Sequence, residues 1–221
     1  MNNMDISKHL SIWPKLTKRE QERLVEAATF DTVKAGEHIH DGNKECTGLI
    51  LVASGQLRAY IISESGKEIT LYRLLEGDIC LFSASCIINN LKLDIMIKAE
   101  KDTSFWLIPT ETYKSLMDQS VTISNYTNEI LASRMSDIVY LMEQVMWHSF
   151  DQRLASFLVN ESTLENSERL SITHEEIANH MGTAREVVTR MLKYFQSEGL
   201  VSLSRGSIEI NDVSRLKALA E

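Results

Sequence analysis

Residues 173–192 contain two helix starts separated by one tight turn, and this pattern restricts the fold of the C-terminal part of the chain. Thr173 with Glu176 three residues later has the spacing of a capping box, and Thr183 with Glu186 repeats it. Gly182 lies between them, and glycine accepts the backbone angles of a sharp corner between two helices. The pattern predicts a short helix, a turn and a longer second helix.

The second predicted helix has an apolar side and a cationic side. Apolar residues that recur at helical spacing should face a core: Val188, Met191, Leu192 and Phe195. The other side carries the polar residues Arg185, Thr189, Arg190 and Lys193. Gly199 is expected to end the helix, and a hairpin with its turn at Arg205-Gly206 should follow. A winged helix-turn-helix with cations on its second helix suits the DNA major groove.

This stretch resembles the DNA-binding domain of the cyclic-AMP receptor protein and fumarate-nitrate regulator (Crp/Fnr) superfamily of bacterial transcription factors. In the receptor-protein branch the recognition helix carries Arg-Glu-x-x-x-Arg, and Arg185, Glu186 and Arg190 occupy those places. The resemblance implies that these three residues read base edges, although Glu186 is also the expected capping partner of Thr183. Phosphate contacts are expected from the remaining polar residues of the motif: Thr173, Thr183, Thr189 and Lys193.

The charge of the chain limits how it could bind nucleic acid. The net charge is −8, and residues 147–221 hold eight Lys and Arg against eleven Asp and Glu. General phosphate binding needs a basic domain, so affinity for DNA must come from a few local contacts. No apolar run is long enough to span a membrane, and the N-terminus lacks the layout of a signal peptide, so we expect a cytoplasmic protein.

Residues 30–109 change to an alternation with a period of two, interrupted by glycine turns, which predicts an antiparallel β-sandwich or jelly roll. The order of the turns resembles the cyclic-nucleotide-type sensor domain of the same superfamily, in three segments: Val52-Ala53-Ser54-Gly55, Gly66-Lys67-Glu68 and Gly77-Asp78. Together these patterns predict an α+β protein. Residues 1–110 would be the jelly-roll sensor, 111–146 a dimerisation helix and 147–221 the winged helix-turn-helix.

The nucleotide-binding signature of that superfamily is missing. Nucleotide-binding members place an Arg-Ser pair near the end of the phosphate cassette, but residues 77–90 contain no arginine, and Leu93 and Asp94 stand near the expected pair. A carboxylate without a cation would oppose a cyclic phosphate. Cyclic AMP is therefore not expected as the effector, whose identity stays open.

Two further constellations allow alternative interpretations. Cys80 and Cys86 frame one loop, either as a redox-sensing or metal-sensing pair or as small buried apolar residues. His38 and His40 followed by Glu45 resemble part of the ligand set of cupins, which would make the chain a metal-dependent enzyme. Cupins need another histidine on a later strand, and residues 46–120 contain none. We therefore assign no metal ligands and no catalytic residues, and favour an effector-controlled transcription regulator.

The helical region 111–146 carries a stripe that advances by three or four residues, which indicates the seam of a two-helix coil. The stripe consists of Ile123, Thr127, Ile130, Arg134, Ile138, Leu141 and Val145. A single helix cannot bury such a seam on itself, and the stripe resembles the dimerisation helix of the superfamily. The expected partners are a second copy of the chain, a palindromic double-stranded operator and, for an activator, RNA polymerase.

Overall fold

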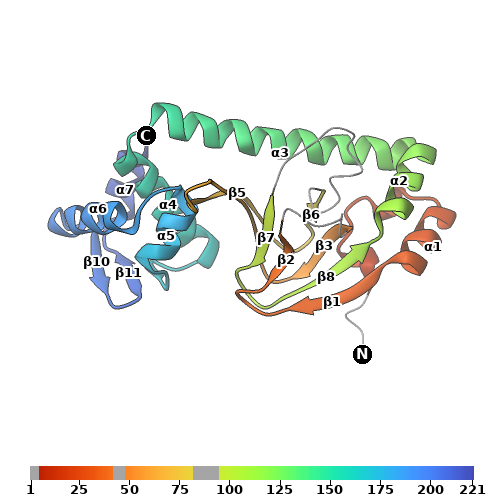
Figure 1. Cartoon of the computed structure of the whole chain (residues 1–221), viewed down its shortest axis with the longest axis horizontal. Helices are drawn as coiled ribbons and strands as arrows, with labels where there is room; N and C mark the ends of the chain where they lie inside the picture. Colours follow the sequence, from red (N-terminus) through yellow and green to blue (C-terminus); the bar gives the residue numbers. More distant parts are fainter. Residues whose placement is uncertain (1–4, 42–47, 82–94) are drawn as a thin grey trace. The chain divides into compact units, whose positions relative to one another are not determined.

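The structure is a computed structural model that describes residues 5–41, 48–81 and 95–221 (Figure 1). The chain divides into two compact units, one formed by residues 1–61 with 71–138 and the other by residues 62–70 with 139–221. The first unit is built on β-sheets and the second mainly on helices, which confirms the predicted α+β class. Within the described ranges, no helix is both long and apolar enough to cross a lipid bilayer.

Two four-stranded sheets form the first unit, one with strand order β1-β8-β3-β6 and one with order β2-β7-β4-β5. The strands are β1 (Thr29–Val33), β2 (His38–Asp41), β3 (Leu49–Ser54), β4 (Leu57–Ile62), β5 (Glu68–Leu74), β6 (Ile79–Cys80), β7 (Met96–Ala99) and β8 (Thr103–Ile108). Residues from both sheets share one buried apolar cluster. The two sheets therefore pack face to face as the predicted sandwich.

Strand β3 is buried on both faces, because successive side chains of a strand point to opposite sides. Ile50 and Val52 join the core between the two sheets, whereas Leu49 and Leu51 join a second core. Helices cover that second core: η1 (Ile6–Lys8), η2 (Trp13–Lys15), α1 (Lys18–Ala27) and α2 (Thr110–Gln119). The run Leu49–Ser54 consequently reads as nearly continuous apolar sequence instead of an alternation.

The region predicted as one helix over 111–146 is two helices, α2 and α3 (Val121–Trp147). Ser120 separates them with an extended backbone, φ −125° and ψ 110°. Its hydroxyl accepts a hydrogen bond from the Ile123 N–H at 3.3 Å, which satisfies one of the amides left unpaired at the start of α3. The long helix therefore begins at Val121.

The predicted coil seam on α3 is wrong in its first half. Ile123 and Thr127 are buried, and Ile130 packs against the helix-covered core of its own unit. The Arg134 guanidinium lies 4.6 Å from the centroid of the Tyr72 ring on β5. Ile123 and Thr127 are therefore inaccessible to a second copy, and Ile130 and Arg134 are half-buried contacts within the protomer.

The second unit contains the C-terminal part of α3, helices α4 to α7 and a small sheet. Its elements are α4 (Phe150–Glu165), β9 (Arg169–Leu170), α5 (His174–Met181), α6 (Arg185–Ser197), β10 (Val201–Ser204), β11 (Ser207–Ile210) and α7 (Val213–Ala220). Strands β10 and β11 pair from Val201↔Ile210 to Ser204↔Ser207. This register leaves Arg205-Gly206 as a two-residue turn, which confirms the predicted wing. Gly199 follows α6 with φ +74°, as expected for a residue that ends a helix.

We expect Gly55→Ala to destabilise the protein more than Gly66→Ala does. Both glycines have positive φ, +95° and +79°, but a Cβ on Gly55 would lie 2.5 Å from the backbone oxygen of Asp102, whereas nothing lies within 4 Å of one on Gly66. The clash should lower the free energy of unfolding by roughly 1–3 kcal/mol beyond the shared cost of left-handed strain. Urea unfolding of the two variants measures the difference. Equal losses would contradict the tight packing at Gly55.

Candidate nucleic-acid interface

The first helix of the predicted motif, α5, starts at a complete capping box. The Thr173 N–H donates to Glu176 Oε2 at 2.7 Å, and the Glu176 N–H donates to Thr173 Oγ1 at 3.2 Å. This confirms the first predicted box. The Thr173 hydroxyl also donates to Glu176 Oε2 at 2.7 Å, so a phosphate at this hydroxyl would compete with the carboxylate.

The second predicted capping box, between Thr183 and Glu186, is wrong. Helix α6 begins at Arg185 with Ala184 as its N-cap residue, and no side chain caps it. The Thr183 N–H instead donates to the Ala178 carbonyl at 3.1 Å, which closes the end of α5 after Gly182 with φ +67°. Thr183 therefore belongs to the turn. Among the described residues, the Glu186 carboxylate has no hydrogen-bond partner and remains available to a ligand.

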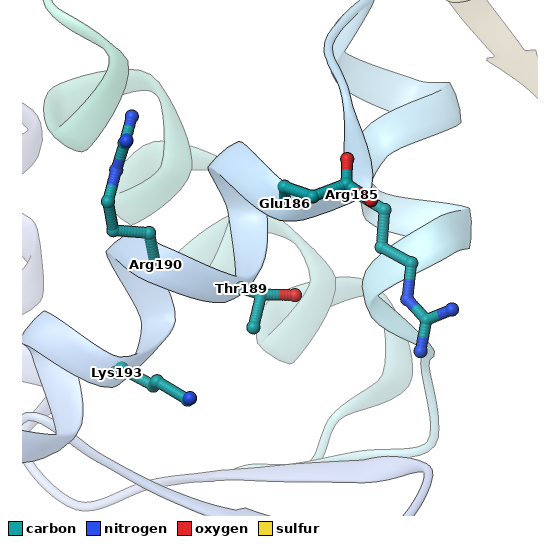
Figure 2. A pocket seen from close by; sticks show the side chains of 5 residues that line it. All are labelled: Arg185, Glu186, Thr189, Arg190 and Lys193. Atoms are coloured by element: carbon teal, nitrogen blue, oxygen red, sulfur yellow. The ribbon is translucent and has the colours of Figure 1, made fainter.

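Helix α6 is divided into a buried and an exposed side. Val188, Leu192 and Phe195 are fully buried in the core of the second unit. At 3.6 residues per turn, the five polar residues of the other side occupy a continuous arc of about 140°. These residues line one open groove of about 490 Å³: Arg185, Glu186, Thr189, Arg190 and Lys193 (Figure 2). Because the apolar side is packed into the core, the polar arc must face outward.

The groove carries three cations and one carboxylate. Within the described part of the chain, neither Arg185 nor Arg190 nor Lys193 forms an ion pair with an acidic side chain, so their charges are not neutralised. Figure 2 shows Arg185, Thr189 and Lys193 along one side of α6, with Arg190 pointing away from them. An anionic ligand broader than a single phosphate can therefore meet cations at several points along the helix.

His174, the first residue of α5, also reaches this surface, and sequence reasoning did not assign it a role. Its Nδ1 lies 2.9 Å from Thr189 Oγ1 on α6. Burial, and then the positive charges of Arg185 and Lys193, hold the pKa of the imidazole below its usual value. The contact joins residues 15 positions apart, and no local spacing rule could have indicated it.

Five of the seven predicted DNA-contacting residues therefore line one groove. Thr173 lies instead at the start of α5, where its hydroxyl belongs to the capping box. Thr183 lies in the turn between α5 and α6. These two positions flank the groove in sequence but are not among the residues that line it.

The cysteine and histidine constellations are located only in part. Cys80 is fully buried in the core between the sheets, with its Sγ 3.9 Å from the Tyr72 hydroxyl, whereas Cys86 lies outside the described residues. The sensing role of the thiol pair stays a prediction.

The register of β2 shifts between His38 and His40, and His38 Nε2 lies 2.9 Å from the Tyr60 hydroxyl. The described residues contain no group of three or more His, Cys, Asp or Glu side chains that could hold a metal ion.

Asp94, on which the argument against cyclic AMP rests, also lies outside the described residues, as do Leu93 and most of the segment 77–90. The part of that segment that is described ends at Leu81. The expectation about the effector therefore rests on the sequence.

Comparison with known proteins gives consistent matches. The cyclic nucleotide-binding domain matches residues 30–120, and the Crp-like helix-turn-helix domain matches residues 152–219. The crystal structure of a Crp/Fnr-family regulator from Eubacterium rectale has 52% sequence identity and a TM-score of 0.93, covering 96% of this chain and 99% of that one.

Two named relatives match over most of the chain. The cyclic AMP receptor protein of Thermus thermophilus is 27% identical over 78% of this chain and 79% of its own length. The transcriptional activator Anr of Pseudomonas aeruginosa is 26% identical over 85% of this chain and 79% of its own. With these matches and the winged helix-turn-helix in place, the chain belongs to the Crp/Fnr family of DNA-binding transcription regulators, which are not enzymes.

Proposed function

We propose that two copies of this chain bind a palindromic operator, each placing α6 in the major groove. The observation that carries this proposal is the polar arc of α6, where three cations without acidic partners among the described residues lie opposite a fully buried apolar face. In helix-turn-helix dimers, two second helices read half-sites one helical turn apart. The cytoplasm is the compartment in which we place the protein.

Within this arc we assign base readout to Arg185, Glu186 and Arg190. Each Arg offers a two-pronged donor to guanine O6 and N7, and Glu186 accepts from the amino group of cytosine. The absence of a Thr183 cap supports this assignment, because Glu186 does not have to serve the helix start. Thr189 and Lys193 lie on the same face and would contact phosphates, with Thr173 and Thr183 as further phosphate contacts.

A dimer requires an apolar surface that the protomer leaves exposed. Val145 of the predicted seam is 49% exposed, and α3 exposes a further apolar stripe. Met135, Val139, Met142 and Met146 are 67%, 43%, 54% and 62% exposed. Their spacing of four, three and four residues is that of a coiled-coil seam. We therefore propose this stripe, called the α3 stripe below, as the contact between two copies.

The sensor would control DNA binding through α3. The N-terminal part of this helix packs into the helix-covered core of the first unit, and the same helix continues into the second unit as far as Trp147. A ligand that binds one position of α3 more tightly than another would shift the populations of the two. The sequence argues against cyclic AMP as this ligand, and a thiol-directed or metal signal through Cys80 and Cys86 is a candidate. For an activator, RNA polymerase would be the next partner.

The attachment of α3 to the first unit offers a physical route for such a signal. Arg134 forms ion pairs with Asp137 at 2.9 Å and with Asp78 at 3.4 Å, and it stacks over Tyr72. Its buried Nε has no partner among the described residues, which costs roughly 1–3 kcal/mol. Helix α3 is thus tied to β5 and to the residue before β6 by a contact that is only partly satisfied. Small displacements of these strands would change a charged contact on the helix directly.

Arg185→Ala should weaken binding to the best operator by about 1–3 kcal/mol per half-site and relax the preference at one base pair, because it removes the bidentate hydrogen bonds to guanine. Lys193→Ala should weaken binding to all sequences alike. It should also reduce the slope of the logarithm of the binding constant against the logarithm of the salt concentration by about one for each phosphate that the lysine neutralises. Fluorescence anisotropy with duplexes selected from a random library measures both effects. Lys217→Ala on α7 removes the same charge and is the control.

If Arg185→Ala and Lys217→Ala bind every duplex equally well, the α6 face does not contact DNA. A uniform loss over all sequences for Arg185→Ala would instead place that residue on the phosphate backbone.

Met142→Asp should dissociate the dimer without unfolding the protomer, because it puts a charge into a surface that is exposed only in the single chain. Ser133→Asp is the matched control, since Ser133 is exposed and lies about 160° around α3 from Met135. Sedimentation equilibrium gives the mass of each variant. A Met142→Asp protein that remains dimeric would show that the α3 stripe is not the interface.

Cyclic AMP should not bind saturably to this chain, because residues 77–90 offer no arginine to the cyclic phosphate. Isothermal titration calorimetry measures this directly, with the cyclic AMP receptor protein of Thermus thermophilus as a positive control. Stoichiometric heat from a tight complex would overturn the expectation.

A further inference from the structure

His174 lies where the start of α5 meets the DNA-facing side of α6. It directly follows the N-cap residue Thr173, and its Nδ1 is 2.9 Å from the Thr189 hydroxyl. The second ring nitrogen, Nε2, has no hydrogen-bond partner among the described residues. It is also not one of the buried polar atoms that lack a partner. Nε2 is therefore accessible to solvent or to a ligand.

The charges that face His174 come mainly from α6. Arg185 and Lys193 are the cations that, after burial, lower the pKa of the imidazole. On its own helix the acidic neighbours are Glu175 and Glu176, and the Glu176 carboxylate is engaged by Thr173. Glu186 is the acidic residue among those that line the groove of α6. In the unbound protein, burial and these cations therefore lower the pKa of His174 and favour its neutral form.

Bound DNA should reverse the effect of the surrounding charges on the pKa of His174. The phosphates of bound DNA bring negative charge close to the ring, and this charge offsets the positive charges of Arg185 and Lys193 that oppose protonation. The pKa of His174 must then rise in the complex. Protonation also fixes the direction of the hydrogen bond to Thr189, because both nitrogens of a charged imidazole are donors. With Nδ1–H donating to Thr189 Oγ1, the threonine hydrogen can be donated to a phosphate oxygen.

We propose that His174 is a proton-linked contact to the DNA backbone, which takes up one proton from solvent when α6 binds DNA. In the bound state Nε2–H donates to a phosphate oxygen, and Nδ1–H turns the Thr189 hydroxyl toward a second one. The proposal rests on the assignment of the α6 face to DNA. It adds to that assignment a pH dependence and one further binding residue.

The sign of the linkage follows from the two pKa values. The pKa is lower in the unbound protein than in the complex, so DNA binding gains affinity as the pH falls through the interval between them. Below the lower pKa and above the higher one, affinity should not depend on this group. Inside the interval, each histidine contributes up to about a tenfold change of the dissociation constant per pH unit.

The test measures binding to a random-sequence duplex at low salt between about pH 5 and 8, since a phosphate contact requires no operator. The wild-type protein should bind more tightly as the pH falls. His174→Gln should lose this pH dependence and bind at every pH with the weaker affinity that the wild type has at alkaline pH. His174→Lys should also lose the pH dependence, but bind with the tighter affinity that the wild type has at acidic pH. His180→Gln, on the same helix, is the control and should retain the wild-type dependence.

The protonation itself can be followed by the NMR chemical shift of the His174 ring, which should give a higher pKa in the complex than in the unbound protein. An unchanged pKa, or a His174→Gln variant with the wild-type pH dependence, would overturn the proposal. If Arg185→Ala loses affinity while the His174 variants behave as wild type, the DNA face stands and only this inference fails. If neither Arg185→Ala nor the His174 variants differ from wild type, the α6 face itself is misassigned.

Discussion

Burial of one side of α6 determines which of its side chains are presented to a ligand. Val188, Leu192 and Phe195 have no exposed surface, so rotation of the helix about its axis would expose apolar area or leave a void. The opposite arc is then fixed without any interaction of its own. Three cations on that arc have no acidic partners among the described residues, although the chain as a whole is acidic. The packed core thereby keeps three mutually repelling positive charges close together on the surface, where an anionic ligand can bind them.

Much of the second unit could be predicted because its signals are local. The capping box at Thr173, the glycine that ends α6 and the two-residue turn of the wing each depend on neighbouring residues, and each is where the sequence places it. The spacing of Thr183 and Glu186 fits a capping box equally well. It fails because the Thr183 amide already closes the end of α5, which is a constraint from the preceding helix.

Features that depend on tertiary packing were less accessible from sequence. Helix α3 carries apolar residues in two phases, and periodicity alone does not tell which phase faces the protomer. Ile123 and Ile130 face their own core, and the apolar residues left exposed on the helix include Met135 and Met142. The contact between His174 and Thr189 could not be predicted for a related reason, because it exists only after two helices have packed.

The position of Glu186 among the cations has a consequence for errors of recognition. In the proposed complex, a duplex that offers a cytosine amino group satisfies the carboxylate. A duplex that does not leaves an unpaired negative charge pressed against the base edges, next to the phosphate backbone. Wrong sequences are then discriminated by an unfavourable contribution to the free energy of binding, instead of by the loss of a favourable one. A regulator with few contacts per half-site can in this way leave incorrect sites quickly, without needing to bind the correct one more tightly.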